Sequence, residues 1–342
     1  MRLSKIFSPL LGLLFLVACK NPQIEKEASS AAKEPSLDTL HLALDWRPNV
    51  LHSGIFYAQA KSAFKEAGIH LVWDTPEIDD YTKKPIFRLL DSEVDLAIGP
   101  SEHLLSFAAK GGELKAQAVA TILQSDRSAF VVKKSSGIHT PAEIEGKTYL
   151  GYHTPLEDEI LAAMISDAGG DPEFKTHTPG RLQVWEAFLR DSGDVAWVFL
   201  HWEAIQAEMA GDSLESFIPN DYGVPYGYSS VIMAPSKMDS IQEDLVHRFL
   251  KVCAEAYSGI QENPEHALAS IRAEVDHSNF QDSIFINKAF ADILPHFGRG
   301  EAWGNMKPEK WQKYGLWLQE KDLLRDSLLP IESYYRNDLL MR

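Results

Sequence analysis

Residues 40–68, LHLALDWRPNVLHSGIFYAQAKSAFKEAG, combine a short apolar segment, a polar turn and a longer amphipathic segment. The apolar residues 40–44 predict a buried strand, and residues 45–49 interrupt it with charged, aromatic and proline residues. Residues 52–67 predict a helix that Gly68 closes. A strand that continues through a polar turn into a helix is typical of α/β proteins, and the turn then lies at the carboxyl end of the strand.

The same alternation continues along the chain. Strands are predicted at residues 70–73, 94–98, 130–132, 148–150, 195–200 and 230–234, and helices at residues 85–90, 102–110 and 156–168. The sequence after residue 234 is mostly helical in pattern. Two α/β units in series predict a parallel or mixed sheet in each of two lobes, with a ligand cleft between them.

The composition excludes several classes of protein. The 342 residues include 49 acidic and 33 basic side chains, a net charge of -16, so nucleic acid is not an expected partner. Hydrophobic residues at 45% and aromatic residues at 10% are sufficient for a buried core. The two cysteines, Cys19 and Cys253, exclude a disulfide framework and a cysteine-rich metal site. We expect Cys253 to be a buried thiol inside a helix.

The N-terminus predicts a targeting signal. Arg2 and Lys5 precede an apolar run over residues 9–18, which is shorter than the ~20 residues that span a bilayer. Residues 16–19, LVAC, resemble the lipobox of bacterial lipoproteins, in which the cysteine is lipidated and becomes the mature N-terminus. We therefore expect a lipoprotein signal peptide at 1–18, lipidation at Cys19 and a flexible tether at 19–37. An ordinary secretory signal is the alternative; either way the protein faces the periplasm or the exterior of a bacterial cell envelope.

Four predicted strands end in polar and aromatic clusters, at residues 45–49, 99–103, 151–155 and 201–203. Ligands of α/β proteins bind beyond the carboxyl ends of such strands. Tryptophan and tyrosine beside a carboxylate suit a flat, nitrogen-rich ligand, because the rings stack on its face while Asp or Glu accepts from its N–H groups.

A family resemblance rests on the same segments. Residues 45–49, DWRPN, followed by HSGI at 52–55 and YA at 57–58, resemble the opening signature of thiamine-pyrimidine-precursor (formylaminopyrimidine) substrate-binding proteins of ABC transporters. Residues 145–157, 201–205 and 303–318 also match, so the resemblance covers residues 40–340. It implies a two-lobed type II periplasmic-binding-protein fold, with 38–126 and 229–342 as lobe 1 and 127–228 as lobe 2. The implied partners are a small-molecule ligand, an ABC-transporter permease and, through the lipid, a membrane.

The departures from the family pattern bear on catalysis. The superfamily includes the fungal thiamine-pyrimidine synthases, which this sequence resembles and which hold pyridoxal phosphate on a lysine just after the matching strand, with a histidine four residues on. This chain has Ser101 and Leu105 at the corresponding positions, and it lacks the synthases' cysteine cluster. Without that lysine the cofactor has no covalent anchor. We therefore expect a binding protein without a cofactor rather than an enzyme.

The candidate ligand-binding residues have both functional and structural interpretations. Trp46 and Tyr152 are expected to stack on the ligand ring, with Trp202 as a third candidate, although any of these rings could be core. Glu203 could accept from the amino edge of an aminopyrimidine or simply provide acidic charge at a helix N-terminus. Asp45 and Asn49 could bind ligand or cap the following helix. The other candidates are His52, Tyr57, Ser101, Thr154 and Tyr226, with Tyr222 and Tyr228 as alternatives to Tyr226.

Two rival hypotheses concern the ligand. His52, His103, His153 and His201 could converge with Glu102 and Glu203 on a metal, but the sequence has no closely spaced histidine pair and we expect no metal site. The ligand could instead be a flavin, another heteroaromatic or a small anion. Anions are disfavoured, because we expect Arg47 to be the only cation near an acidic site.

Overall fold

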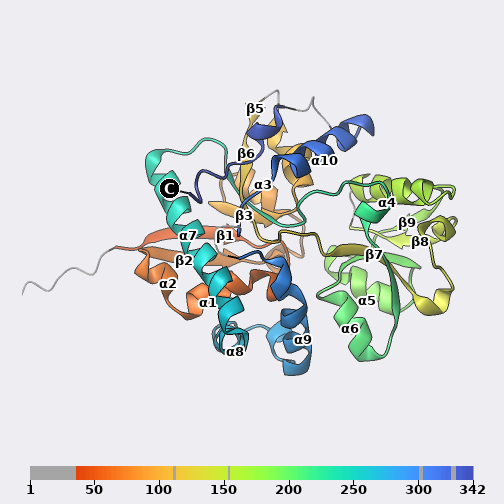
Figure 1. Ribbon diagram of the computed structural model, residues 1–342, viewed down its shortest axis with the longest axis horizontal. Helices are drawn as coiled ribbons and strands as arrows, with labels where there is room; N and C mark the ends of the chain where they lie inside the picture. Colours follow the sequence, from red (N-terminus) through yellow and green to blue (C-terminus); the bar gives the residue numbers. More distant parts are fainter. Residues whose placement is uncertain (1–35, 111–112, 153–154, 300–302, 325–328, 342) are drawn as a thin grey trace, which may run out of the picture. The chain divides into compact units, whose positions relative to one another are not determined.

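The computed structural model describes residues 36–110, 113–152, 155–299, 303–324 and 329–341, which form two five-stranded sheets and the helices that cover them (Figure 1). The predicted signal peptide, Cys19 and nearly all of the predicted tether lie outside the described residues. Over the part of the chain that is described, no helix is both long enough and apolar enough to cross a membrane.

The first sheet is mixed and has the strand order β2-β1-β3-β12-β6. Strand β1 pairs in parallel with β2 and β3, whereas β12 runs antiparallel to both β3 and β6. The strands are β1 Asp38–Ala43, β2 Ile69–Asp74, β3 Leu96–Gly99, β6 Ala116–Thr121 and β12 Val231–Pro235.

The second sheet has the strand order β11-β7-β10-β8-β9 and is also mixed. Strand β10 is antiparallel to β7 and parallel to β8. The strands are β7 Ser128–Lys133, β8 Thr148–Leu150, β9 Lys175–His177, β10 Val195–Phe199 and β11 Leu214–Phe217. A separate small hairpin pairs β4 Ala109–Lys110 with β5 Glu113–Leu114.

Helices cover both sheets. The α-helices are α1 Ser53–Ala60, α2 Ala63–Glu66, α3 Pro85–Leu90, α4 Pro155–Asp167, α5 Val184–Leu189, α6 Glu203–Ala210, α7 Ser240–Glu262, α8 Pro264–Glu274, α9 Ser283–Ile293 and α10 Pro308–Glu320. Short helical turns are η1 Val50–His52, η2 Pro76–Asp79, η3 Leu104–Ala108, η4 Lys134–Ser136, η5 Pro141–Ile144, η6 Arg181–Gln183, η7 Pro219–Tyr222, η8 Ser278–Phe280, η9 Leu294–His296 and η11 Ile331–Ser333.

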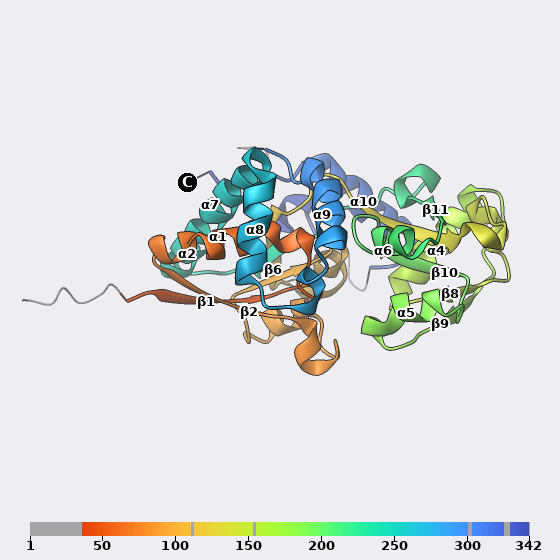
Figure 2. The ribbon, with the colours of Figure 1, turned by 90° about the horizontal axis from the view of Figure 1, so that it is seen from below.

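Side-chain alternation along the strands explains why both faces of each sheet are covered. In β1, Leu40 and Leu42 join the core beneath α1, α7 and α8, which Figure 2 shows on one face of the sheet, while Ala43 faces the opposite core. In β7, Ala129 and Val131 pack with α5. Phe130 and Val132 lie in the core that also contains residues of α4. Each central strand is therefore buried on two sides.

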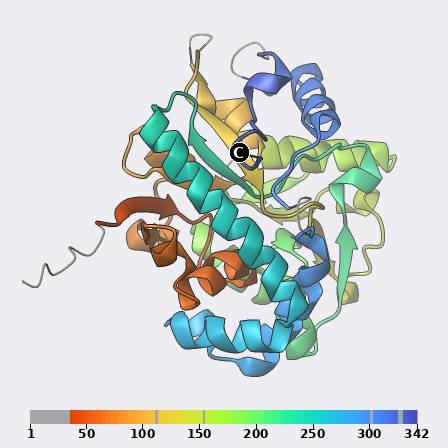
Figure 3. The same cartoon turned by 60° about the vertical axis from the view of Figure 1, so that its left-hand side comes forward.

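Helix α1 packs closely on α7, which lies alongside it in Figure 3. A Cβ atom added at Gly54 would lie only 2.3 Å from the Tyr257 ring, so a larger residue would push the two helices apart. The Tyr257 hydroxyl donates a 2.8 Å hydrogen bond to the carbonyl oxygen of Leu51. This contact fixes the turn between β1 and α1, which carries Asp45 and Trp46.

The predicted α/β class is confirmed, and several element predictions are corrected. The helix predicted over 52–67 is broken, because Ser62 adopts a left-handed conformation between α1 and α2. The helix predicted over 102–110 is a π-helical turn followed by β4. Strand β6 was missed because its small residues, AQAVAT, are buried throughout and show no alternation. The sequence pattern also did not predict the short strands β9, which is exposed, and β11, which is partly buried. Cys253 is fully buried in α7, as predicted.

Candidate functional site

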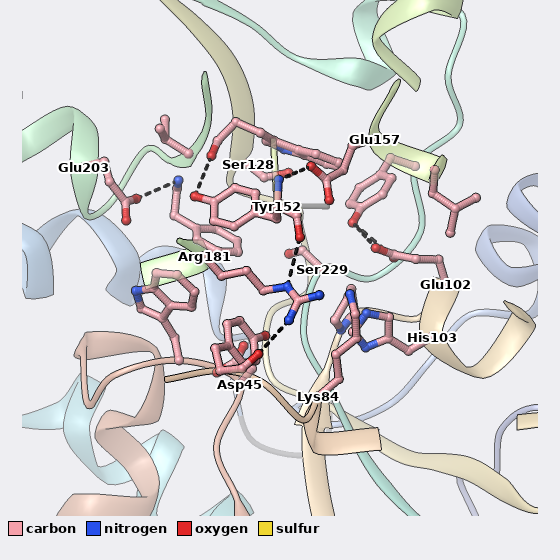
Figure 4. Close-up of a pocket in the computed structure, with 18 of the residues that line it drawn as sticks. Asp45, Lys84, Glu102, His103, Ser128, Tyr152, Glu157, Arg181, Glu203 and Ser229 are labelled. Carbon is pink, nitrogen blue, oxygen red and sulfur yellow. Dashed lines mark hydrogen bonds between the residues drawn. The ribbon is translucent and has the colours of Figure 1, made fainter. Parts of the chain in front are cut away.

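A pocket of about 150 Å³ lies where loops from both sheets meet, and Figure 4 shows its side chains. Loops of the first sheet contribute Asp45, Trp46, Tyr81, Lys84, Pro100, Glu102, His103 and Phe107. Segments of the second sheet contribute Ser128, Tyr152, Leu156, Glu157, Arg181, Trp197, Val198, Phe199 and Glu203, and the segment leading into β12 contributes Tyr226 and Ser229. We call this set the cleft pocket. It lies at the strand ends at which the sequence predicts a site.

Asp45 lies on the pocket wall just after β1 and is held from two sides. The Nε2 atom of His52 lies 2.8 Å from its Oδ1, and the Ser230 hydroxyl donates to its Oδ2 at 3.0 Å. Capping of the following turn belongs to Asn49, whose side chain accepts from the Leu51 N–H and donates to the Arg47 carbonyl. The structure therefore separates the two residues, because Asn49 caps while Asp45 faces the pocket.

Aromatic rings form two walls of the cleft pocket. The Trp46 ring meets Tyr152 edge to face at 5.9 Å between centroids, and Tyr81 at 5.5 Å. Further along, Trp197 meets Tyr226 at 5.3 Å. Each edge-to-face contact holds two rings at a fixed angle to one another.

Trp202 does not take part in this arrangement. Its ring packs on Phe285 of α9 at 4.6 Å between centroids, and the side chain is buried in the core of the first sheet. The core interpretation of Trp202 fits the structure, and its place as a third stacking residue does not.

Glu203 is the first residue of α6 and is 5% exposed. Its Oε2 accepts a 2.9 Å hydrogen bond from the Phe199 N–H. Burial raises the pKa of the carboxyl to about 7, since the site replaces little of the hydration that the charged form would lose. Glu203 thus occupies a helix N-terminus and also faces the pocket, so the two interpretations of this residue are compatible.

A second buried carboxyl, Glu102, lies elsewhere on the pocket wall. The Tyr226 hydroxyl lies 3.1 Å from both of its oxygens, and burial raises the pKa of Glu102 to about 7. Of the three candidate tyrosines, Tyr226 is the one on the pocket wall. The Tyr228 hydroxyl accepts from the Lys307 N–H, and the Tyr222 ring packs against Phe217.

Two cations that the sequence did not single out line the pocket. Arg181 donates from Nε to the Tyr152 carbonyl at 3.0 Å and from Nη1 to the Tyr81 carbonyl at 2.7 Å. Lys84 precedes α3, and burial lowers the pKa of its ammonium. Arg47 instead pairs with Glu77 and Glu186 and is not among the described lining residues. The prediction that Arg47 is the only nearby cation is therefore wrong.

The other candidate residues lie apart from the described lining of the pocket. His52 is buried behind Asp45, and Tyr57 belongs to α1 on the side of α7. The Ser101 hydroxyl accepts from the Tyr228 N–H and is buried. Thr154 and His153 lie outside the described residues. Five candidates therefore line the pocket: Asp45, Trp46, Tyr152, Glu203 and Tyr226.

The strand-end histidines do not form a metal site in the described part of the chain, where no group of three or more His, Cys, Asp or Glu side chains could hold an ion. His103 lines the pocket, and burial together with the Lys84 charge holds its pKa well below the usual range. His201 is buried, which lowers its pKa to about 3. Both imidazoles are therefore neutral at physiological pH.

Comparison with protein families and curated proteins places this geometry in context. A family model described as NMT1/THI5 like matches residues 49–267. The chain is 24% identical over 340 residues to a formylaminopyrimidine-binding protein of Halalkalibacterium halodurans, covering 98% of each protein. It is 26% identical over 308 residues to a 4-amino-5-hydroxymethyl-2-methylpyrimidine phosphate synthase of Legionella pneumophila, covering 87% of this chain and 91% of the relative.

Solved structures show the same fold at low sequence identity. The alkanesulfonate-binding protein SsuA of Xanthomonas axonopodis superimposes with a TM-score of 0.66 at 12% identity, over 90% of this chain and all of the other. A Candida albicans protein described as having the generic periplasmic-binding-protein fold gives a TM-score of 0.63 at 15% identity, over 88% of this chain and 97% of the other. The described part of the chain therefore has the two-lobed fold of periplasmic binding proteins.

Proposed function

Because the chain belongs to the NMT1/THI5-like family, we propose that it is a lipid-anchored solute-binding protein of an ABC importer that captures a thiamine-precursor aminopyrimidine. In this proposal lobe 1 comprises residues 38–126 and 229–342, and lobe 2 comprises residues 127–228. Cys19 carries the lipid, and a permease in the same membrane receives the ligand. The binding-protein relative from H. halodurans, which matches along 98% of the chain, supports the binding role.

The observation that carries the proposal is a buried carboxyl beside two aromatic rings in one pocket. Trp46 and Tyr152 supply the faces on which a single heteroaromatic ring stacks. Glu203 contacts the edge of that ring. Because the Phe199 N–H already holds its Oε2, its Oε1 is left to accept from the amino group of the ligand.

The size of the pocket favours one ring over three. Pockets for drug-sized ligands have volumes of ~300–1,000 Å³. The cleft pocket has about 150 Å³, which suits a substituted pyrimidine better than a flavin. A flavin or another heteroaromatic remains the alternative ligand for the same receptor role.

An enzyme of thiamine-pyrimidine synthesis is the alternative from a different class, since the Legionella relative is named as a synthase. The synthases that this chain resembles hold their cofactor on a lysine where this chain has Ser101. The Ser101 hydroxyl is bonded to the Tyr228 N–H and lies outside the described lining of the pocket. This position offers no amine to the cleft, and we propose no catalytic residue.

Titration calorimetry of the full chain tests the proposal directly. We expect one molecule of 4-amino-5-hydroxymethyl-2-methylpyrimidine to bind per chain, at least ~10-fold more tightly than riboflavin, a difference of ~1.4 kcal/mol. Mass spectrometry of the mixture should recover the pyrimidine unchanged. If only riboflavin binds tightly, the ligand is a flavin and the proposed pyrimidine is wrong. If the pyrimidine is chemically converted, the protein is an enzyme and the proposed binding role is wrong.

A further inference from the structure

Two cations of the cleft pocket, Lys84 and Arg181, have no carboxylate at ion-pair distance among the described residues. Arg181 uses Nε and Nη1 on the carbonyls of Tyr152 and Tyr81, which leaves Nη2 available. The Lys84 ammonium donates no hydrogen bond to the described part of the chain. Figure 4 shows both side chains pointing into the same part of the pocket.

The two charges act on one another. Burial and the Arg181 charge both lower the pKa of Lys84, so the ammonium and the guanidinium are near enough to repel each other in a partly dry site. Buried charges in proteins are normally paired, because an unpaired one loses hydration without compensation. The neighbouring residue Lys83, by contrast, lies nearer the surface and forms ion pairs with the exposed Asp91 and Glu93.

The acids of the pocket are engaged by other groups. Glu102 accepts from the Tyr226 hydroxyl, and Glu157 accepts from the Tyr149 hydroxyl and the Tyr152 N–H. Both carboxylates act on Lys84 electrostatically, but neither forms an ion pair with it. The two positive charges therefore remain available to a ligand.

The groups around Lys84 add further hydrogen-bonding capacity. The imidazole of His103 is buried, and its Nδ1 has no hydrogen-bond partner. Lysine offers three N–H donors, and the free edge of Arg181 offers more, a set that matches an oxyanion with several acceptor oxygens. Figure 4 shows Lys84 and His103 on one side of the pocket and Glu203 on the other.

We propose that Lys84 and Arg181 form an oxyanion subsite and that the ligand is an aminopyrimidine bearing a phosphate monoester on its exocyclic carbon. The inference rests on the proposed function, since the subsite would receive a substituent of the ring that stacks on Trp46 or Tyr152. The subsite distinguishes this chain's ligand from a neutral formylaminopyrimidine.

Calorimetry with matched ligands tests the subsite. The probes are 4-amino-5-hydroxymethyl-2-methylpyrimidine, its phosphate monoester and a formylaminopyrimidine, titrated into the full chain. We expect wild type to bind the ester at least ~10-fold more tightly than the alcohol. Lys84→Gln should weaken binding of the ester by ~10- to 100-fold and binding of the alcohol by less than ~3-fold. Lys84→Arg should keep most of the preference, and Lys65→Gln, which removes an exposed charge on α2, should match wild type.

Several outcomes would overturn the inference and leave the proposed function intact. The first is that wild type binds the ester and the alcohol with equal affinity. The second is that Lys84→Gln lowers the affinity for both by the same factor. The third is that Lys84→Gln lowers the affinity for the formylaminopyrimidine as much as that for the ester. If wild type binds none of the pyrimidines, the proposed function fails. The subsite is then tested alone with benzyl phosphate and benzyl alcohol. Phosphate-dependent binding that Lys84→Gln abolishes supports it, and its absence overturns it.

Discussion

The guanidinium of Arg181 donates a 2.7 Å hydrogen bond to the carbonyl oxygen of Tyr81, and this bond joins the segment before α5 to the loop after β2. The same guanidinium lies 5.9 Å from the centre of the Tyr81 ring. Trp46 and Tyr152 meet across the same junction. Loops of the two sheets are therefore in direct contact beside the pocket, so its two walls lie close together.

Ligand binding should favour this closed arrangement, because the closed state alone offers a ligand contacts from both walls. We expect small-angle X-ray scattering to show a modestly smaller radius of gyration when a bound aminopyrimidine is present. An unchanged radius at saturating ligand would mean that the free protein is already closed or that one wall suffices for binding.

Glu203→Gln should weaken aminopyrimidine binding by at least ~10-fold. The Phe199 N–H will retain the amide oxygen of the substituted side chain, so its NH₂ group must face the pocket and oppose the amino group of the ligand. If riboflavin binds to wild type, its affinity should not be lower in Glu203→Gln. Glu208→Gln, an exposed residue of the same helix that pairs with Lys288, is the matched control in the calorimetric comparison. Equal affinity of Glu203→Gln and wild type would remove Glu203 from the recognition site.

Two tryptophan variants separate stacking from core packing. Trp46→Ala should cost ~1–3 kcal/mol of ligand binding, the range for loss of a stacked aromatic ring. Trp202→Phe should leave the affinity unchanged and lower the free energy of unfolding, since Trp202 packs on Phe285 in the core. Calorimetry and denaturant titration measure the two effects. The assignment is wrong if Trp202→Phe impairs binding and Trp46→Ala does not.

The contribution of Glu102 and Glu203 to stability should fall as the pH rises from about 5 to 7.5, while that of the buried His103 and His201, whose pKa values are lowered, should rise. Burial raises the pKa of Glu102 and of Glu203 from 4.5 to about 7, so over this range the folded state holds more protons than the unfolded state. Each carboxyl then contributes a loss of up to about 3 kcal/mol in the free energy of unfolding. Urea titrations at several pH values should show the free energy of unfolding of wild type falling more, or rising less, over this range than that of Glu203→Gln. Parallel profiles would indicate that the Glu203 carboxyl keeps an ordinary pKa in the folded protein.

Anchoring depends on Cys19 in the proposal. Cys19→Ser should move the protein from the membrane fraction to the soluble fraction, without change in thermal stability, because the predicted tether precedes the folded residues. Fractionation followed by immunoblotting provides the measurement. A variant that stays with the membrane would be held by another surface.

Four of the five residues that sequence placed in the pocket follow strands, whereas Tyr226 lies before β12. Asp45 and Trp46 come after β1, Tyr152 after β8, and Glu203 after β10, where the rule for strand ends applies. The polar cluster after β3 also supplies Glu102 and His103, which the sequence suggests only as metal ligands. Local sequence thus predicts a site residue when a strand positions it.

The remaining pocket residues depend on long-range packing. Lys84 directly precedes a short helix and Arg181 begins a 3₁₀ turn, and neither stands in a cluster that distinguishes it from the other cations of the chain. Sequence also could not decide between Asp45 and Asn49 as the capping residue, since both side chains suit that role. The hydrogen bonds of the folded turn decide it.

The position of β12 has a consequence for the order of folding. This strand lies between β3 and β6 and pairs with both, yet the whole second sheet separates it from them in sequence. During synthesis from the N-terminus, the first sheet lacks β12, which joins β3 to β6, until residues 231–235 have been made. All strands of the second sheet have been made by then. Closing so long a loop slows folding. The first sheet should therefore be completed after the second sheet, although its first strands come earlier in the chain.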